Sequence, residues 1–332
     1  MLLLIKIDYN AIASNASYFK RTCKTKLCAV VKNNAYGHGL LKTAKCLKNV
    51  ADYFAVATLD EGIKISGLGV PVLVLMPLSF QDTATALKHG LCVTVDSFET
   101  LEKVAAAAKG GAAFAHIKID SGMHRFGFVR EQLRNMCNVL LQYPNVVVKG
   151  VYTHMWGSSV DVCLAQAVYF DECVSYLQQR LGNIEIKHVA NTSTSLLGDR
   201  FCYDMVRVGL GLYGYGADCL KPAKTVTAKV VATKFVAKGE TVGYGGAKVD
   251  SDMQLAVIDA GYANGLPRCL KGSGVIAKGC RCKIVANVCM SCAIIDVSGV
   301  NIGVGEEVYL LGNGANPSSD NVIVYELLCN LH

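Results

Sequence analysis

Long apolar runs are missing from this chain of 332 residues. Its most apolar stretch, Leu68 to Phe80, contains Pro71 and Pro77 and is too short to cross a bilayer. The N-terminus, MLLLIKIDYN, lacks the basic start, the longer apolar segment and the small-residue cleavage site of a signal peptide. The sequence therefore predicts a cytoplasmic protein without a membrane span.

Clusters of one charge are missing too. The formal net charge is +7, from 33 Lys and Arg against 26 Asp and Glu, but the basic residues are scattered along the chain. Proteins that bind nucleic acid by charge gather basic side chains into a run or a patch. We therefore expect no nucleic-acid partner, and a small-molecule substrate is favoured.

Apolar residues, by contrast, are plentiful. Hydrophobic residues make up 52% of the chain and charged residues 18%, which supplies large buried cores and leaves little room for disorder. The 15 cysteines would suggest a disulfide framework in a small secreted protein. In a large chain without a signal segment they are predicted to be reduced thiols that pack as small hydrophobes.

Eight short runs of β-branched and apolar residues recur up to Tyr213. Amphipathic segments with helical spacing lie between most of them, such as Phe98 to Lys109 and Leu164 to Leu181. This alternation predicts parallel βαβ units, and eight units predict an α/β fold, a (β/α)8 TIM barrel. The runs are Leu27 to Lys32, Tyr53 to Thr58, Val70 to Met76, Cys92 to Ser97, Ala113 to Asp120, Val146 to His154, Glu185 to Asn191 and Met205 to Tyr213.

The pattern changes after Gly216. From Thr225 onward, Val, Ile, Thr and Tyr runs alternate with Lys-Gly, Gly-Gly, Ser-Gly and Asn-Gly turn signals, without a long helical pattern. This favours a C-terminal, mostly antiparallel β domain. The predicted domains are a barrel over residues 8–216 and a β domain over residues 217–332.

Polar residues stand where the predicted barrel strands end. In a (β/α)8 barrel the reactive groups lie at the carboxyl ends of the strands, so these residues are the candidates for chemistry. A single lysine at a strand end is commonly a solvated surface charge, and the argument therefore rests on the set. Its members are Lys32, Asp120 with Arg125 shortly after it, His154, Asn191 with Thr192, and Arg207.

Residues 29–39, AVVKNNAYGHG, closely resemble the segment that carries the cofactor lysine in alanine racemases, which use pyridoxal 5'-phosphate (PLP). Further matches follow in the same order along nearly the whole chain. They are KIDSGMHRFG (118–127), YTH (152–154), HVANT (188–192), MVRVGLGLYG (205–214), GYG (243–245), GYANG (261–265), Cys289-Met290 and Tyr325-Glu326.

This resemblance implies a fold-type III PLP enzyme, in which the N-terminal strand, residues 1–7, joins the C-terminal β domain. It also implies a homodimer with active sites shared between the barrel of one subunit and the β domain of the other. The implied activity is the interconversion of L-alanine and D-alanine, which supplies D-alanine for peptidoglycan. No metal is expected.

The resemblance also implies roles for single residues. Lys32 holds PLP and exchanges a proton on one face of the substrate Cα, and Tyr244 of the partner subunit serves the opposite face. Arg207 contacts the pyridine nitrogen, which stays unprotonated because a guanidinium donates a hydrogen bond but keeps its proton. The other implied cofactor residues are Tyr36, His154, Thr192, Gly209, Leu210 and Tyr325; Arg125 and Met290 contact the substrate carboxylate, and His188 and Lys118 support the site, Lys118 matching a lysine that is carbamylated in some relatives.

Other functions remain open. Ser291 stands where relatives have Asp. A small pocket distinguishes substrates that differ by a methylene or a hydroxyl by a binding free energy of only about 1–3 kcal/mol. A serine or broad-specificity racemase is therefore an alternative. A non-catalytic PLP-binding protein on the same barrel is another, although such proteins usually lack the second domain. A basic amino-acid decarboxylase of this fold would carry a characteristic cysteine and aspartate site, which is not apparent here.

The cysteine spacing allows one further alternative. Cys280, Cys282, Cys289 and Cys292 form CxC and CxxC pairs, a pattern that also occurs in structural zinc sites. Cys280 and Cys282 fall in a β pattern and Cys289 belongs to the racemase-like motif, so a zinc site is the less favoured interpretation.

Overall fold

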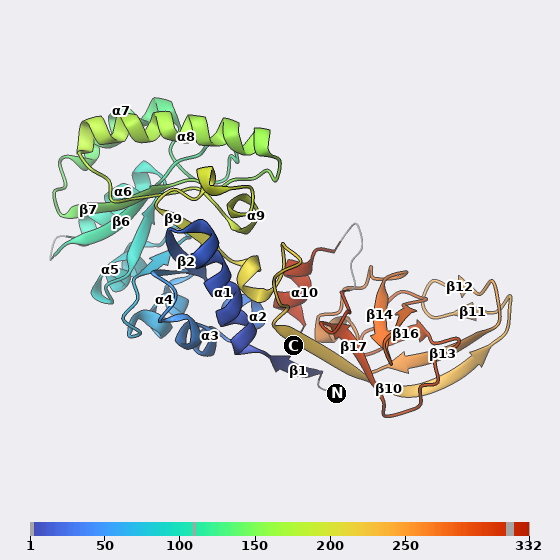
Figure 1. The fold of residues 1–332 in the computed structure, drawn as a ribbon. Helices are drawn as coiled ribbons and strands as arrows, with labels where there is room; N and C mark the ends of the chain where they lie inside the picture. Colours follow the sequence, from blue (N-terminus) through green and yellow to red (C-terminus); the bar gives the residue numbers. More distant parts are fainter. Residues whose placement is uncertain (1–2, 109–110, 317–321, 332) are drawn as a thin grey trace. The chain divides into compact units, whose positions relative to one another are not determined.

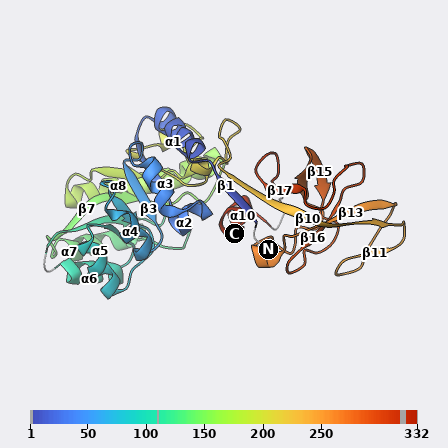
Figure 2. The same ribbon diagram turned by 90° about the horizontal axis from the view of Figure 1, so that it is seen from below.

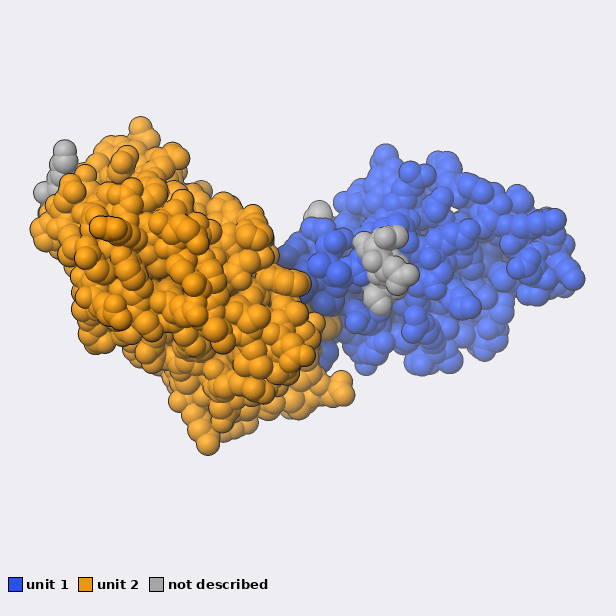
Figure 3. Space-filling model, turned by 90° about the horizontal axis from the view of Figure 1, so that it is seen from above, with its two compact units in different colours: residues 1–8, 36–38, 222–332 blue, residues 9–35, 39–221 orange. Residues whose placement is uncertain are grey.

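The computed structural model describes residues 3–108, 111–316 and 322–331. The chain divides into two compact units, coloured separately in Figure 3. The larger unit comprises residues 9–35 and 39–221, and the smaller comprises residues 1–8, 36–38 and 222–332.

The larger unit contains an eight-stranded parallel sheet with the order β8-β7-β6-β5-β4-β3-β2-β9. Main-chain hydrogen bonds from Arg207 N to Ala190 O (2.9 Å) and from Asp204 N to Lys187 O (3.1 Å) link the two ends of this order, so the barrel is nearly closed. The predicted (β/α)8 barrel is confirmed. The strands are β2 (Lys26–Val30), β3 (Tyr53–Val56), β4 (Val72–Val74), β5 (Cys92–Val95), β6 (Ala113–Lys118), β7 (Val146–Tyr152), β8 (Ile186–His188) and β9 (Met205–Val208).

Helices surround these strands in Figure 1. Their apolar spacing explains the packing: in α7 the buried residues Leu133, Met136, Cys137 and Leu140 form one stripe at the i, i+3, i+4, i+7 spacing of an amphipathic helix. The helices are α1 (Tyr9–Cys23), α2 (Lys32–Gly37), α3 (Leu40–Leu47), α4 (Leu59–Ser66), α5 (Phe80–Lys88), α6 (Phe98–Ala107), α7 (Leu133–Leu140), α8 (Val160–Leu181) and α9 (Thr192–Ser195), with 3-10 turns at Arg130–Gln132, Asp199–Phe201 and Leu210–Tyr213.

Helix starts follow local capping signals. Thr58 accepts the N–H of Glu61, and the Glu61 carboxylate accepts the N–H of Thr58, so α4 begins with a capping box. Ser79 and Ser97 cap α5 and α6 in the same way through their hydroxyl groups. No helix in the described ranges is long and apolar enough to cross a membrane.

The smaller unit is built on an antiparallel sheet with the order β15-β14-β17-β10-β13-β16, and β1 pairs with β10 off this path. Figure 2 shows β10 as its longest strand. β1 runs antiparallel to it, with Leu4 opposite Thr227. The elements are β1 (Leu4–Ile7), β10 (Lys224–Val236), β11 (Thr241–Val242), β12 (Ala247–Lys248), β13 (Met253–Ile258), β14 (Gly274–Ala277), β15 (Cys280–Lys283), β16 (Ala293–Asp296), β17 (Glu307–Leu311), a 3-10 turn at Tyr262–Asn264 and helix α10 (Val324–Asn330).

A buried lysine holds the end of α10. Lys224 at the start of β10 is 1% exposed, and its Nζ donates to the carbonyl oxygens of Leu328 (2.8 Å) and Leu331 (2.9 Å). A cation at a helix C-terminus satisfies carbonyl groups that have no partner within the helix. The smaller unit thus fixes the helix that carries Tyr325.

We expect Lys224→Met to lower the free energy of unfolding by roughly 1–3 kcal/mol, because two buried carbonyl groups lose their donor. Urea unfolding followed by circular dichroism measures this loss. Lys229→Met, an exposed site on the same strand, is the control and should change stability by less than about 0.5 kcal/mol. Equal stability of the two variants would contradict the capping role.

Candidate active site

The predicted barrel residues gather at one face of the larger unit. Lys32 follows β2, Lys118 ends β6, His188 ends β8 and Arg207 lies in β9; His154 comes two residues after β7. Because the strands are parallel, their carboxyl ends share one face of the barrel. The structure therefore brings these five residues to the same end.

His154 lies in the electrostatic field of several basic side chains. Burial, and then the positive charges of Arg207, Arg125, Lys118 and Lys32, lower the pKa of His154 to about 3. The imidazole is therefore neutral at neutral pH, in the field of four cationic side chains. A face with this charge attracts an anionic ligand.

Lys32 is followed by a left-handed helical turn, which the sequence interpretation did not anticipate. The φ angles of Asn33, Asn34, Ala35 and Tyr36 are 53°, 54°, 55° and 52°. This conformation costs about 1–2 kcal/mol per ordinary residue and is least costly for Asn, Asp and Gly. Backbone hydrogen bonds from Ala35 N to Val31 O (2.8 Å) and from Asn34 N to the Glu61 carboxylate (3.0 Å) hold the turn.

The Arg207 guanidinium is held by hydrogen-bond acceptors at the carboxyl ends of β7 and β8. Its Nη1 donates to His188 Nδ1 (3.0 Å) and His188 O (2.9 Å). Its Nη2 donates to Thr153 O (2.6 Å) and Val189 O (3.2 Å). These four contacts engage the four Nη hydrogens and leave Nε–H as the remaining donor of this guanidinium within the described part of the chain.

His116 on β6 is a buried site residue that the sequence interpretation missed. Its Nδ1 lies 2.8 Å from His188 Nε2, and neither histidine is exposed. Side chains at i and i+2 share one face of a strand, so the pattern His116-Ile117-Lys118 was a usable signal: it puts His116 on the same face of β6 as the predicted Lys118.

Lys118 is buried at 6% exposure beside two rings, with its Nζ 5.3 Å from the centroids of both Phe126 and Tyr152. Burial first, and then the charges of Arg207 and Arg125, lower the pKa of this amine to about 8. A larger share of its amine is therefore unprotonated near neutral pH than for a solvated lysine.

Two backbone segments meet at Thr192, the first residue of α9. The Thr192 hydroxyl accepts the N–H groups of Gly209 (3.3 Å) and Gly211 (3.1 Å). Leu210 begins the adjacent 3-10 turn, and the first N–H groups of such a turn have no partner within it. A hydroxyl and main-chain donors together form a polar corner of the kind that binds anions.

Arg125 lies in the loop that follows β6. The Asp120 carboxylate accepts the N–H groups of Gly122 and His124, each at 3.0 Å, and so folds this loop tightly. Arg125 itself is exposed. The loop therefore holds the Arg125 backbone in place while its guanidinium stays accessible.

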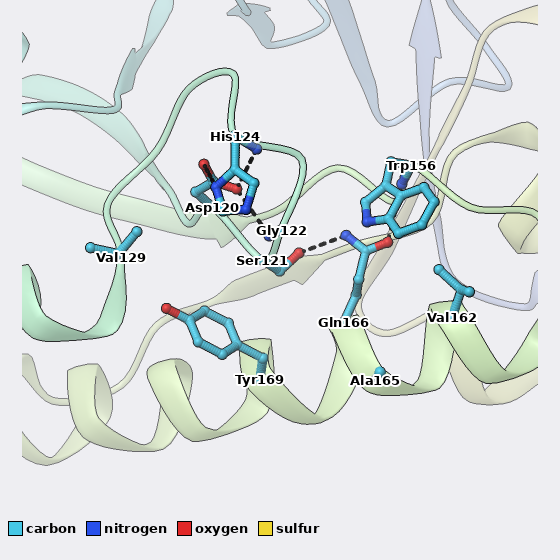
Figure 4. Close-up of a pocket in the computed structure, with 10 residues that line it drawn as sticks. All are labelled: Asp120, Ser121, Gly122, His124, Val129, Trp156, Val162, Ala165, Gln166 and Tyr169. Atoms are coloured by element: carbon cyan, nitrogen blue, oxygen red, sulfur yellow. Dashed lines mark hydrogen bonds and ion pairs between the residues drawn. The ribbon is translucent and has the colours of Figure 1, made fainter.

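A cavity of about 470 Å³ opens beside that loop (Figure 4). In Figure 4 helix α8 contributes one wall, through Tyr169, Gln166 and Val162, and the Asp120–His124 loop lies opposite. The Gln166 side chain donates to Ser121 Oγ at 2.9 Å. Trp156 at its edge is 57% exposed. None of the predicted cofactor or substrate residues lines this cavity.

In the smaller unit, Tyr244 occupies the tip of the β11–β12 hairpin. It is 69% exposed and stands between Gly243, Gly245 and Gly246, whose φ angles are 62°, 88° and 57°. Glycine adopts such angles without strain, so this sequence makes a tight turn that presents the tyrosine to solvent.

Met290 is likewise exposed, at 58%, in the loop between β15 and β16. Its carbonyl oxygen accepts the N–H of Ala263 at 2.9 Å, and the Cys289 carbonyl accepts that of Tyr262 at 3.0 Å. These bonds join the Cys289-Met290 motif to the GYANG motif. Two matched segments that are distant in sequence are thus neighbours in the fold.

Tyr36 and Tyr325 face each other, with ring centroids 5.9 Å apart. Tyr36 is buried at 7% exposure, whereas Tyr325 is 39% exposed. Burial raises the pKa of both phenols, so both keep their protons and can donate a hydrogen bond.

The cysteines form no metal cluster in the described residues: no group of three or more His, Cys, Asp or Glu there could hold an ion. All fifteen are free thiols. Cys280 and Cys282 lie on β15, as the β pattern indicated. The structure gives the zinc interpretation no support.

Fold and site together define a class: a (β/α)8-barrel enzyme with a cationic face at the carboxyl ends of its strands and a C-terminal β domain. Two family models match, "Alanine racemase, N-terminal domain" over residues 7–217 and "Alanine racemase, C-terminal domain" over residues 223–332. The chain belongs to the alanine racemase family, and it is an isomerase of that family.

Individual relatives agree with this assignment. The chain is 34% identical to the alanine racemase of Cutibacterium acnes over 97% of this chain and 94% of that protein. It is 33% identical to alanine racemase 1 of Bacillus subtilis over 98% of this chain and 90% of that protein. The alanine racemase of Clostridium difficile 630 superposes with a TM-score of 0.89 at 30% identity, covering 100% and 94% of the two chains.

Two further solved structures carry names that mention a ligand. The Bartonella henselae alanine racemase, described with covalently bound pyridoxal phosphate, has a TM-score of 0.87 at 25% identity and coverages of 100% and 97%. The Bacillus anthracis alanine racemase, described with bound L-Ala-P, has a TM-score of 0.87 at 28% identity and coverages of 99% and 92%.

Proposed function

We propose that this chain interconverts L-alanine and D-alanine with PLP attached at Lys32, in a homodimer whose subunits share their active sites. The observation that carries the proposal is the relation of Lys32 to Arg207: both lie at the carboxyl-end face of the barrel, and Arg207 retains one guanidinium donor, its Nε–H, after its four contacts.

The residues present fit PLP chemically. PLP carries a phosphate and an aromatic nitrogen acceptor, and the barrel face offers four cationic side chains around His154 together with the donors at Thr192. The Bartonella henselae relative, described with covalently bound pyridoxal phosphate, supports the same cofactor. A buried, cationic and donor-rich corner is what an organic phosphate requires.

Seven residues would hold the cofactor besides Lys32. Arg207 would donate to the pyridine nitrogen and keep its proton. His154 would stand beside the ring, neutral in the field of its cationic neighbours. The phosphate would be bound by the hydroxyl groups of Tyr36, Thr192 and Tyr325 and by the main-chain N–H groups of Gly209 and Leu210. When bound, PLP supplies the electron sink that stabilises negative charge at the substrate Cα.

Two residues would move the proton. The Lys32 amine, once free, removes or returns the Cα proton on one face. The partner subunit's Tyr244 acts on the opposite face, where a phenol needs nearby positive charge to function as a base. Arg207 supplies such charge, and its contact to His188 fixes its direction. Arg125 and the backbone of Met290 would bind the substrate carboxylate.

The homodimer accounts for the exposed groups of both units. Tyr244 at the hairpin tip is 69% exposed, Met290 is 58% exposed and Tyr262 beside it is 46% exposed. In the barrel unit Trp156 stands 57% exposed at the edge of the cavity. Large exposed side chains of this kind are typical of surfaces that a partner covers.

Serine is the second candidate substrate, and Ser291 is the observation that favours it. This exposed residue replaces the Asp of relatives directly beside Met290, which removes a negative charge next to the predicted carboxylate site. The family, and a relative described with bound L-Ala-P, support alanine as the first candidate. The proposed physiological role is the cytoplasmic supply of D-alanine for peptidoglycan.

The test measures conversion of L-alanine and of L-serine by the purified protein with PLP, using chiral chromatography, together with the visible absorbance of the bound cofactor. We expect the absorbance band and formation of D-alanine. The band without turnover would leave a PLP-binding protein, and release of carbon dioxide would leave a decarboxylase. Faster turnover of serine than of alanine would make serine, rather than alanine, the substrate of the enzyme.

We further propose that Lys118 is carbamylated. Its neutral amine adds to CO2, a C–N bond forms, and one proton leaves to solvent, so a cation becomes a carboxylate beside Arg125 and Arg207. The lowered pKa, about 8, supplies the neutral amine, and the change of sign relieves repulsion among three cations. The product would orient Arg125.

We expect ¹³C-enriched bicarbonate to give a carbamate signal in the NMR spectrum, absent from Lys118→Ala. Removing CO2 should raise the KM for alanine, because the Arg125 guanidinium loses its carboxylate partner, by about tenfold or more. Lys103→Ala, a partly exposed lysine of α6 that pairs with Glu99, is the control. A spectrum with no signal that depends on Lys118 would rule the modification out.

A further inference from the structure

The hydrogen-bond chain that begins at Arg207 fixes where the protons of two buried histidines lie. A guanidinium has only donors, so His188 Nδ1, 3.0 Å from Arg207 Nη1, must accept. A neutral imidazole then carries its proton on the other nitrogen, Nε2. That N–H points to His116 Nδ1 at 2.8 Å, which must also accept, and the His116 proton therefore sits on its own Nε2.

Both histidines are neutral in this arrangement. Each is 0% exposed. Burial, and then the charge of Arg207, lower the pKa of His116 to about 3 and the pKa of His188 well below its usual value. An extra proton on His188 would sit on Nδ1 and face an N–H of Arg207. An extra proton on His116 would sit on Nδ1 and face the N–H of His188 Nε2. One tautomer of each ring satisfies both the contact to Arg207 and the contact between the two rings.

The surroundings are shaped for His116. Gly150 on β7 has no side chain and so leaves room for the His116 ring: a Cβ at position 150 would lie 2.5 Å from His116 Nδ1. The two imidazoles meet edge to face, with centroids 5.0 Å apart, and Tyr152 stacks on His188 at 4.8 Å with ring planes 12° apart. The Tyr152 hydroxyl is itself bonded to Thr94 Oγ1 at 2.9 Å. The rings therefore have no room to turn over.

The hydrogen-bond chain ends at His116 Nε2. His116 Nε2 is buried and lacks a hydrogen-bond partner among the described residues. An unpartnered buried N–H costs about 1–3 kcal/mol, and an apolar residue at position 116 would remove that cost. The structure instead retains a histidine whose one engaged nitrogen is the acceptor for His188, which indicates that this acceptor has a use.

We propose that His116 is a positioning residue: by accepting from His188 Nε2 it fixes the His188 tautomer, and the His188 tautomer fixes the direction of the Arg207 guanidinium. Without that acceptor, His188 can carry its proton on Nδ1, where it faces the Arg207 N–H donor-to-donor, and Arg207 turns away. The effect on catalysis rests on the proposed function, since it is Arg207 that would contact the cofactor.

The wild-type protein tests the proton positions directly. With ¹⁵N-labelled histidine, NMR reads which ring nitrogen bears the proton, and this measurement needs no cofactor or substrate. We expect the His188 proton on Nε2. A proton on His188 Nδ1 would overturn the proposal whatever the enzyme's activity, whereas absence of racemase activity alone would overturn only the proposed function.

Two variants separate positioning from packing. His116→Asn keeps an amide oxygen near the place of Nδ1, whereas His116→Leu fills the site without an acceptor. We expect His116→Leu to lose the single His188 tautomer and to reduce kcat about 10- to 100-fold with little change in KM, and His116→Asn to retain both. Equal kcat and an unchanged His188 tautomer in His116→Leu would overturn the proposal.

Discussion

Lys32→Ala is expected to lose racemase activity by about 10⁴-fold or more, since one residue would bind the cofactor and exchange the Cα proton. Lys32 is the first residue of α2, two residues after the end of strand β2, and its positive charge contributes to the lowered pKa of His154. The alanine side chain at position 32 of the variant has neither the amine that would attach PLP nor a base. Both the visible absorbance band and the formation of D-alanine should disappear.

The matched control is Lys26→Ala. Lys26 is an exposed lysine at the opposite end of the same strand, so the two variants differ in which end of β2 loses an amine. Lys26→Ala should retain the absorbance band and wild-type turnover. Substantial turnover in Lys32→Ala would remove Lys32 from the mechanism and leave the barrel face without its proposed base.

Tyr244→Phe is expected to lower kcat by about 10²- to 10⁴-fold, because the phenol would be the acid and base on one face of Cα. The ring remains, so packing at the hairpin tip is preserved while the hydroxyl is lost. Tyr143→Phe, an exposed tyrosine of the barrel unit, serves as the control and should keep wild-type kcat. The measurement is the rate of D-alanine formation.

Mixing the two inactive variants tests whether subunits share sites. If they do, a heterodimer of Lys32→Ala and Tyr244→Phe contains one site with both intact residues and one with neither. Random exchange of subunits should then restore about a quarter of wild-type activity, since half of the dimers are mixed and each has one working site. Mixtures that stay inactive after subunit exchange would mean that both residues come from the same chain.

The barrel could be predicted from the sequence because its strands are covered on both faces. Residues such as Leu27, Phe54 and Ile117 are at most 1% exposed, and strands such as β3 and β4 appear as uninterrupted apolar runs of the type found in parallel sheets. Boundaries were less accurate: the run Met205 to Tyr213 contains β9 and then a 3-10 turn at Leu210–Tyr213. Apolar composition alone does not distinguish a strand from the buried turn that follows it.

The arrangement within the site was less accessible. His116 shares a strand face with Lys118, but its role was not identified because that role depends on His188, 72 residues away in the sequence, and on the space that Gly150 leaves. Helix α10 was absorbed into a β pattern, although it carries Tyr325 and a buried lysine holds its end. Such contacts between distant residues leave no local periodicity to detect. The roles of the predicted site residues stay predictions until the variants are measured.

The left-handed turn after Lys32 also bears on the order in which the protein folds. Local preference opposes this conformation at Ala35 and Tyr36, and strained backbone persists only where the surrounding structure imposes it. We therefore expect the turn to form late, after the Glu61 carboxylate at the start of α4 is in place to accept the N–H of Asn34. The proposed binding of PLP at Lys32 should therefore lag behind formation of the barrel, and the cofactor's absorbance would then report a late event in refolding.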